Sequence, residues 1–200
     1  MVATIDLNQM TPGFSDPVFN SQQTFRAILG AMAHPGRIVT AGSALDSPHP
    51  LNRASAAVCL TLLDFETPLW TDLDSDQMAI GWLRFHCGCP VVQNPSEANF
   101  AMITNNDVMP SLDNFKTGND ECPESSTTLI IQTSGLSPMD GKRLSGPGIE
   151  NFSTLKMEGL IERFWKDRQI QFTMFPLGVD IIFTCENTLA VLPRTTKVEG

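Results

Sequence analysis

Charged residues are scarce in this sequence, and most of them are acidic. Asp, Glu, Lys and Arg make up 18% of the 200 residues, with 22 acidic side chains against 13 basic ones and a formal net charge of −9. An average domain carries about 25% charged residues, so either a partner covers part of the surface or uncharged polar loops form much of it. Nucleic-acid binding needs clustered cations that displace counterions from phosphates, and the sequence contains no such cluster, which excludes that class.

Long apolar runs are also missing. A helix that spans a bilayer needs about 20 apolar residues in a row, and none is present. The first residues, MVATIDLNQM, have neither the basic region nor the apolar stretch of a secretory signal. We therefore expect a cytoplasmic protein that makes no membrane contact. Its length is typical of one domain, since domains run about 50–250 residues, and we predict a single domain over residues 1–200.

Cysteines are few, and their pattern is not that of a disulfide framework. The sequence has an odd number of them, Cys59, Cys87, Cys89, Cys122 and Cys185, and we expect free thiols. His86 beside Cys87-Gly88-Cys89 looks like half of a zinc site, but zinc needs four ligands and no second pair accompanies it. Buried thiols are the favoured interpretation, and we predict neither a metal nor a cofactor.

The common enzyme signatures are absent as well. There is no nucleophile-elbow serine and no HExxH pair, and Gly146-Pro147-Gly148 fits neither phosphate-loop pattern, so a plain turn between two strands is favoured there. All five lysines lie in polar surroundings, which argues against a desolvated Schiff-base lysine. No catalytic residue is identified.

What the sequence does contain is a series of amphipathic and β-branched segments. The first predicted helix runs from Pro17 to the His34-Pro35-Gly36 stop, with Phe25, Ile28, Leu29 and Met32 on one apolar face. Further helices are predicted from the Asn52 cap to Leu63, from Asp74 or Ser75 past Phe85, over 106–112 as a short acidic helix, and over 158–169. Strands are predicted at 37–40, 68–71, 90–92, 100–104, 127–133, 179–184 and 189–192, with a turn at 135–141. This order favours an α/β fold with a mixed sheet. The closing hairpin must be antiparallel because its connection is too short for a crossover.

Asp180 is the most informative single residue. It lies inside the apolar run 179–183, where a buried carboxylate needs a partner. Arg194 and Thr195 follow the last predicted strand and can supply a guanidinium and a hydroxyl, and a structural ion pair is favoured over a catalytic one. Arg84 and His86 lie near a helix end, where a charge favoured by the helix dipole is the simpler interpretation than a ligand contact.

Several short motifs in order resemble one known family. They are Phe25-Arg26, His34-Pro35-Gly36, Pro50-Leu51-Asn52, Leu60-Thr61-Leu62-Leu63-Asp64, Thr67-Pro68-Leu69-Trp70, Leu83-Arg84-Phe85-His86, Gly146-Pro147-Gly148-Ile149, Phe175-Pro176-Leu177-Gly178-Val179-Asp180 and Pro193-Arg194-Thr195-Thr196. Each is weak alone, but the set resembles the PhnH family of the bacterial carbon–phosphorus lyase system over roughly residues 14–199. In the family, residues other than cysteine commonly follow the motif that matches Arg84-Phe85-His86, which weakens the metal interpretation further.

The resemblance implies a three-layer α/β/α sandwich, similar to the large domain of pyridoxal-phosphate (PLP)-dependent transferases but without PLP. It also implies a homodimer that works with PhnG, PhnI, PhnJ and PhnL subunits. The resemblance further implies that PhnG, PhnI and PhnL act with this subunit to transfer the ribose triphosphate of ATP to an alkylphosphonate and release adenine. The family supplies no established catalytic residue.

Two hypotheses remain open at this point. The first is a non-catalytic or co-catalytic subunit that supports the transfer through assembly. The second is a small phosphonate- or nucleotide-binding enzyme with its own active site, because arginine forks match phosphonate oxygens bidentately. Its candidate ligand-binding residues are Arg84, His86, Asp180, Arg194 and Thr195. The net charge of −9 opposes unaided attraction of an anionic nucleotide.

Overall fold

The computed structural model describes residues 10–199. The prediction about a signal sequence concerns mainly residues 1–9, which lie outside this range. The elements are α1 (Pro17–Ala33), β1 (Val39–Thr40), α2 (Arg53–Leu62), β2 (Leu69–Thr71), α3 (Met78–Cys87), η2 (Pro95–Glu97), β3 (Phe100–Ile103), η3 (Asn106–Val108), η4 (Leu112–Asn114), η5 (Pro123–Ser125), β4 (Thr128–Gln132), β5 (Gly135–Ser145), β6 (Ser153–Glu158), α4 (Glu162–Phe172), β7 (Asp180–Cys185), β8 (Thr188–Leu192) and β9 (Lys197–Glu199).

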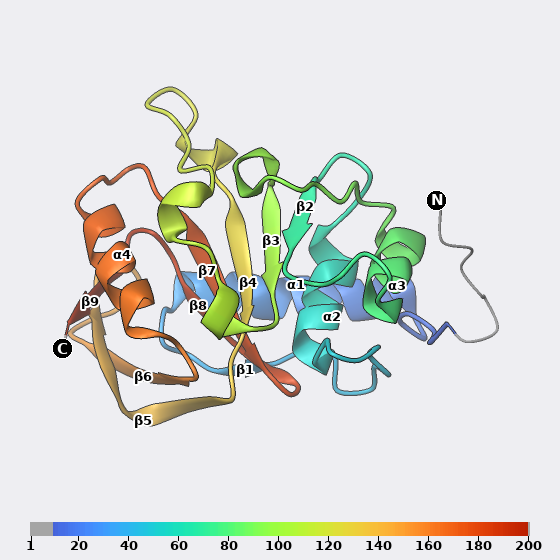
Figure 1. Ribbon diagram of the computed structural model, residues 1–200. Coiled ribbons are helices and arrows are strands. Elements are labelled where there is room, and N and C mark those ends of the chain that lie inside the picture. Colours follow the sequence, from blue (N-terminus) through green and yellow to red (C-terminus); the bar gives the residue numbers. More distant parts are fainter. Residues whose placement is uncertain (1–9, 200) are drawn as a thin grey trace.

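A six-stranded mixed sheet in the order β1-β8-β7-β4-β3-β2 lies at the centre of the molecule (Figure 1). Strands β2, β3, β4 and β7 are parallel, so their carboxyl ends meet at one edge of the sheet. The antiparallel β7–β8 hairpin, in which Cys185 pairs with Thr188, confirms the predicted closing hairpin. Together with the four helices, this confirms an α/β fold with a mixed sheet.

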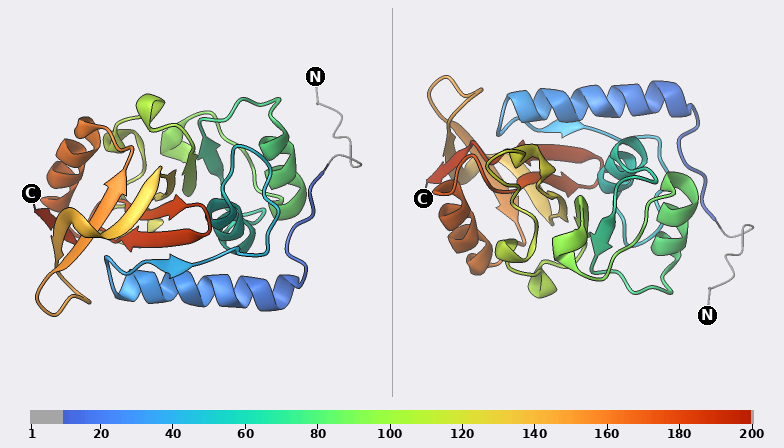
Figure 2. Two further views of the ribbon diagram at one scale, coloured as in Figure 1. Left: turned by 90° about the horizontal axis from the view of Figure 1, so that it is seen from below. Right: turned by 90° about the horizontal axis from the view of Figure 1, so that it is seen from above.

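Each face of this sheet has its own hydrophobic core. Neighbouring residues of a strand point to opposite faces, so Ile130 of β4 packs in the core beneath α1, α2 and α3. Ile131 packs in the other core, with Phe164 of α4 and Leu155 of β6. Figure 2 shows α1 running along one side of the sheet, beside β1. The central strands are therefore buried on both faces, which explains their nearly continuous apolar sequence.

The second core is covered in part by a small antiparallel sheet of order β6-β5-β9 that the sequence did not predict. Strand β5 runs through 135–141, the segment predicted as a turn. A register shift between Ser137 and Lys142 accommodates Pro138, which has no N–H to donate. Glu158 ends β6, so the fourth helix begins at Glu162 and not at 158 as predicted.

Helix α1 begins as predicted, but only part of its predicted apolar face, including Ile28, is buried. The Asp16 Oδ1 atom accepts from the backbone N–H of Phe19 at 3.0 Å, and Pro17 occupies the first turn. The buried residues are Thr24, Ile28 and Ala31, whereas Phe25 and Leu29 are 50% and 56% exposed. Small side chains on the buried face allow α1 to pack closely on α2 and β8. Val18, Phe25 and Leu29 form an exposed line on the outer face, the α1 stripe.

Three smaller predictions also needed correction. Helix α3 begins at Met78, later than the predicted Asp74 or Ser75. Residues 90–92 form a single bridge, between Leu69 and Val91, and not a strand. Residues 106–112 form a 3₁₀ turn at Asn106–Val108 instead of one short helix, and a second such turn begins at Leu112. Within residues 10–199, none of the helices combines the length and apolar character that a membrane crossing requires.

Candidate functional site

The carboxyl ends of the parallel strands border a pocket of about 500 Å³, here called the strand-end cleft. Its lining comprises Asn52, residues 104–107 after β3, residues 132–134 at the end of β4, Gly159, Cys185 and Glu186. Ligands of open α/β sheets bind in the crevice outside the carboxyl ends of the strands. The position of the cleft in the fold therefore makes it a candidate ligand site.

Gln132 fixes the start of α2 to this edge. Its Oε1 atom accepts from the Asn52 backbone N–H at 2.5 Å and from the Ser55 hydroxyl at 2.7 Å, and its Nε2 atom donates to the Pro50 carbonyl at 3.0 Å. The Asn52 side chain caps α2 by accepting from the Ser55 N–H at 2.8 Å, as its cap position in the sequence predicts. One wall of the cleft is thus held by a network of amide and hydroxyl groups.

Asn106 presents an unused acceptor in the same cleft. Its Nδ2 atom donates to the Gln132 carbonyl at 2.9 Å, while its Oδ1 atom is buried and has no hydrogen-bond partner among the described residues. A buried polar atom without a partner costs about 1–3 kcal/mol. A ligand N–H or O–H that reached this oxygen would recover that cost.

The Asp72 carboxylate orders the loop after β3 by accepting from the Thr104 N–H at 3.0 Å and the Asn105 N–H at 2.7 Å.

The electrostatics of the strand-end cleft do not suit an oxyanion. Its charged lining residues are Asp107 and Glu186, both acidic, and the other described lining side chains are uncharged. Two carboxylates repel phosphate or phosphonate oxygens. A neutral polar group is the ligand chemistry that the amide and hydroxyl lining favours.

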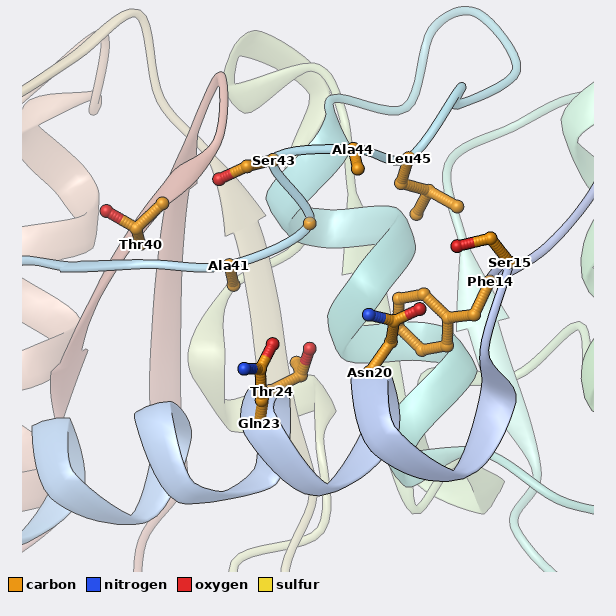
Figure 3. Close-up of a pocket in the computed structure, with 11 residues that line it drawn as sticks. Phe14, Ser15, Asn20, Gln23, Thr24, Thr40, Ala41, Ser43, Ala44 and Leu45 are labelled. Atoms are coloured by element: carbon orange, nitrogen blue, oxygen red, sulfur yellow. The ribbon is translucent and has the colours of Figure 1, made fainter.

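A second pocket, of about 310 Å³, lies between the first turns of α1 and residues 40–45 (Figure 3). Asn20, Gln23 and Thr24 point from α1 toward that segment, and the Phe14 ring also lines the pocket. The described lining side chains are all uncharged. Amides that both donate and accept, beside an aromatic ring, can bind the edge and face of a planar polar ring such as a nucleobase.

The structure pairs Asp180 with Arg194, as the sequence predicted. The Arg194 Nη2 atom lies 2.5 Å from Asp180 Oδ2, and Nε lies 3.3 and 3.2 Å from the two carboxylate oxygens. Arg194 also donates to the Ser126 hydroxyl at 2.6 Å and to the Pro123 carbonyl. The two side chains are 18% and 13% exposed. Because the guanidinium is occupied by protein acceptors, the pair fastens the segment after β8 to the amino edge of the sheet.

Arg168 brings a second guanidinium to this edge. It is 1% exposed, and its Nη2 atom donates to the carbonyls of Pro193 and Thr196 at 2.5 and 3.1 Å. Burial lowers the pKa of Arg168 to about 10, although the Asp180 charge acts in the opposite direction. Thr195, the remaining predicted ligand residue of this group, is half-buried between Arg194 and Thr196.

Arg84 and His86 lie at the other side of the sheet, on α3 beside β2 (Figure 1). The His86 Nε2 atom is 3.2 Å from the Thr11 carbonyl, which also accepts from the Trp82 indole N–H at 2.9 Å. His86 therefore contacts the segment that precedes α1, while Arg84 is exposed. The structure brings Asp180 and Arg194 together but does not bring Arg84 and His86 to them. Ligand binding by these residues stays a prediction.

Sequence reasoning did not identify the strand-end cleft. Its residues come from five separate segments, and the parallel order of β3, β4 and β7 places three of them side by side. The available signal was a polar run directly after each of two apolar strands, at 104–107 and 132–134. The residues between 10 and 199 include no group of three or more His, Cys, Asp or Glu side chains arranged to hold a metal ion.

Comparison with known proteins gives matches along nearly the whole chain. A family model described as "Bacterial phosphonate metabolism protein (PhnH)" matches residues 12–199. The "Alpha-D-ribose 1-methylphosphonate 5-triphosphate synthase subunit PhnH" of Rhizobium meliloti (strain 1021) is 37% identical over 190 residues, covering 93% of this chain and 94% of that protein. The "Putative C-P lyase subunit protein HtxG" of Stutzerimonas stutzeri is 30% identical over 183 residues, covering 88% of this chain and 85% of that protein.

Proposed function

Because this chain belongs to the PhnH family of bacterial phosphonate metabolism proteins, we propose that it is a subunit of a ribose 1-methylphosphonate 5-triphosphate synthase. In this reaction the phosphonate displaces adenine from ATP, so that the ribose triphosphate is transferred to the alkylphosphonate. The observation that carries the proposal is the family match along nearly the full described chain. The chain has a non-catalytic or co-catalytic role within an assembly that contains PhnG, PhnI, PhnJ and PhnL subunits.

The electrostatics support a role within an assembly. Substrate and product carry a triphosphate, and a chain of net charge −9 repels such anions. The linings of the strand-end cleft and of the pocket beside α1 contribute no cation among the described residues. Partner subunits would supply the positive charge that holds the phosphates, while the uncharged pocket beside α1 matches the chemistry of an adenine ring.

The proposal extends to the form of the protein. It is a cytoplasmic single domain that acts as a homodimer, and its fold corresponds to the three-layer α/β/α large domain of PLP-dependent transferases without the cofactor. The separate cores on the two faces of the sheet support the layered arrangement. The exposed apolar side chains of the α1 stripe support burial against another protein surface.

The proposal is tested by reconstitution. The chain is co-expressed with PhnG and PhnI, the complex is isolated by size exclusion, and adenine release from ATP is measured with methylphosphonate and PhnL. We expect the chain to co-elute with its partners and adenine release to require it. Equal adenine release without the chain, or its elution alone while the others assemble, overturns the proposal.

A separate measurement decides whether the chain has an active site of its own. Calorimetry on the isolated protein with ATP and with methylphosphonate is expected to detect no binding of the phosphonate. Saturable binding of methylphosphonate that is lost in Arg194→Lys, with the fold retained, would favour the rival interpretation as a self-sufficient phosphonate-binding protein.

A further inference from the structure

Three of the five cysteines gather where α2 meets the end of α3. Cys59 lies within α2 and is fully buried, Cys87 is the last residue of α3, and Cys89 follows it and is 3% exposed. The Cys87 thiol donates to the Cys59 carbonyl at 3.6 Å, and the Cys89 thiol lies near enough to affect the pKa of Cys87. Cys122 and Cys185 lie elsewhere in the sequence and are not part of this group.

The backbone between Cys87 and Cys89 suits a bond between them. Consecutive Cα atoms are about 3.8 Å apart, so residues separated by one position are within about 7 Å of each other. Gly88 adopts a left-handed conformation with φ of 69°, which turns the chain and shortens that span. A disulfide requires Cα atoms about 4.4–6.8 Å apart. The spacing of two positions, with a left-handed residue between them, therefore suits a disulfide.

The surroundings shift the pKa values of the two thiols in opposite directions. The neighbouring Cys87 thiol, followed by a backbone hydrogen bond at Cys89 and the positive charge of Arg84, lowers the pKa of the Cys89 thiol, while burial and the Asp64 carboxylate act against this. The neighbouring Cys89 thiol, together with burial and Cys59, raises the pKa of Cys87. A thiolate is the nucleophile in thiol oxidation, so a lowered pKa within the pair favours its oxidation.

The turn is also open to a small reagent. Gly88 is exposed, and a Cβ atom built on it would meet no atom within 4 Å. Cys87 is half-buried beside it. Cys59, by contrast, is enclosed within α2, and burial raises its pKa. An oxidant therefore reaches the Cys87–Cys89 turn in preference to Cys59.

We propose that Cys87 and Cys89 form a reversible redox site, a dithiol that a peroxide converts to an intramolecular disulfide. A thiolate of the pair attacks one peroxide oxygen, which gives a sulfenic acid and, after proton transfer, the first water. The second sulfur of the pair then attacks the sulfenic sulfur, forms the S–S bond and releases the second water. Two thiols and one hydrogen peroxide thus give one disulfide and two waters, and a dithiol reductant reverses the change.

Peptide mapping of the full-length protein tests this without any substitution. Trypsin cleaves after Lys and Arg, so residues 85–116 form one peptide that contains Cys87 and Cys89 alone, whereas Cys59 lies in residues 54–84. The protein is treated with hydrogen peroxide, free thiols are alkylated, and the digest is analysed by mass spectrometry. We expect peptide 85–116 to be two hydrogens lighter and unalkylated, and to become doubly alkylated after dithiothreitol treatment.

Single substitutions then identify the sulfur atoms. Cys87→Ser and Cys89→Ser should each abolish the light peptide, and Cys122→Ser, at an exposed isolated thiol, should leave it unchanged. The proposal is overturned if peptide 85–116 stays doubly alkylated under peroxide. A disulfide that joins it to peptide 54–84, or irreversible addition of oxygen to its cysteines, overturns it equally.

Discussion

At the residue scale, the Asp180–Arg194 pair is the ion pair whose loss should lower the stability of the fold most. Both side chains are mostly buried, and the guanidinium has one carboxylate partner for its charge. Asp180→Ala leaves that cation unpaired beside the buried Arg168, and removal of one partner of a buried pair costs about 3–5 kcal/mol. We expect a loss of this size in the free energy of unfolding, measured by urea denaturation.

Glu199→Ala provides the matched control. Glu199 pairs with Lys197 at 2.8 Å and with Arg143 at 3.8 Å, but the side chain of Glu199 is 39% exposed and those of its partners are 54% and 58% exposed. Exposed pairs contribute about 0–1 kcal/mol, so this substitution should change the unfolding midpoint little. If Asp180→Ala behaved like Glu199→Ala, the buried pair would have no structural role, and ligand binding would become the better explanation for it.

At the element scale, glycine positions show why β5 is a strand despite its composition. A Cβ atom on Gly141 would overlap the carbonyl group of Leu155 in β6, so the close approach of the two strands requires glycine there. Gly141→Ala should lower stability by more than about 1–3 kcal/mol, the usual cost of overpacking, because backbone atoms must move. A urea denaturation curve measures the change.

Gly30 is the opposite case. It lies inside α1, and a Cβ atom built there meets nothing within 4 Å. Gly30→Ala should therefore raise stability by about 0.5–1 kcal/mol, since alanine favours the helix and adds no clash. Equal changes in the free energy of unfolding for Gly141→Ala and Gly30→Ala would contradict the strand pairing of β5 and β6.

The same elements explain what the sequence could and could not predict. Asp180 within an apolar run required a partner, and this local requirement led correctly to Arg194. The prediction of a turn at 135–141 was wrong because glycine and proline indicate a turn unless a bulge accommodates them. The bulge depends on pairing with β6, which the sequence of β5 does not contain. The sequence pattern also did not predict which face of α1 is buried. Apolar residues occupy two sides of the helix, and packing against small residues selected the side with Ala31.

The candidate site was predictable only in part for a related reason. Asn106 and Gln132 are 26 positions apart and meet through the pairing of β3 with β4. No pattern within one segment of the sequence predicts such a contact. The cysteine turn, by contrast, is contained in three consecutive residues, and the sequence singled it out as half of a zinc site or as buried thiols.

At the scale of the whole molecule, the α1 stripe provides a test of self-association. Val18, Phe25 and Leu29 are 83%, 50% and 56% exposed along one side of α1. If a second copy covers this surface in the proposed homodimer, Leu29→Glu places a charge in an apolar interface. We expect sedimentation velocity to show a shift from dimer to monomer with the circular dichroism spectrum unchanged.

Phe65→Glu is the control, because Phe65 is 74% exposed in the turn between α2 and β2, away from the stripe. It should leave the dimer intact. A dimer that survives both substitutions would show that α1 is not the dimer surface, and a monomeric parent protein would contradict the proposed homodimer itself.

Strand β7 carries a consequence for any ligand of this protein. Asp180 is its first residue and Cys185, in the strand-end cleft, is its last. Five steps of about 3.3 Å separate them, so the two ends lie about 17 Å apart. The strand is buried on both faces and acts as a rigid spacer between the two edges of the sheet. A small phosphonate can therefore occupy one edge only, and a molecule that is recognised at both must be long enough to pass around the sheet.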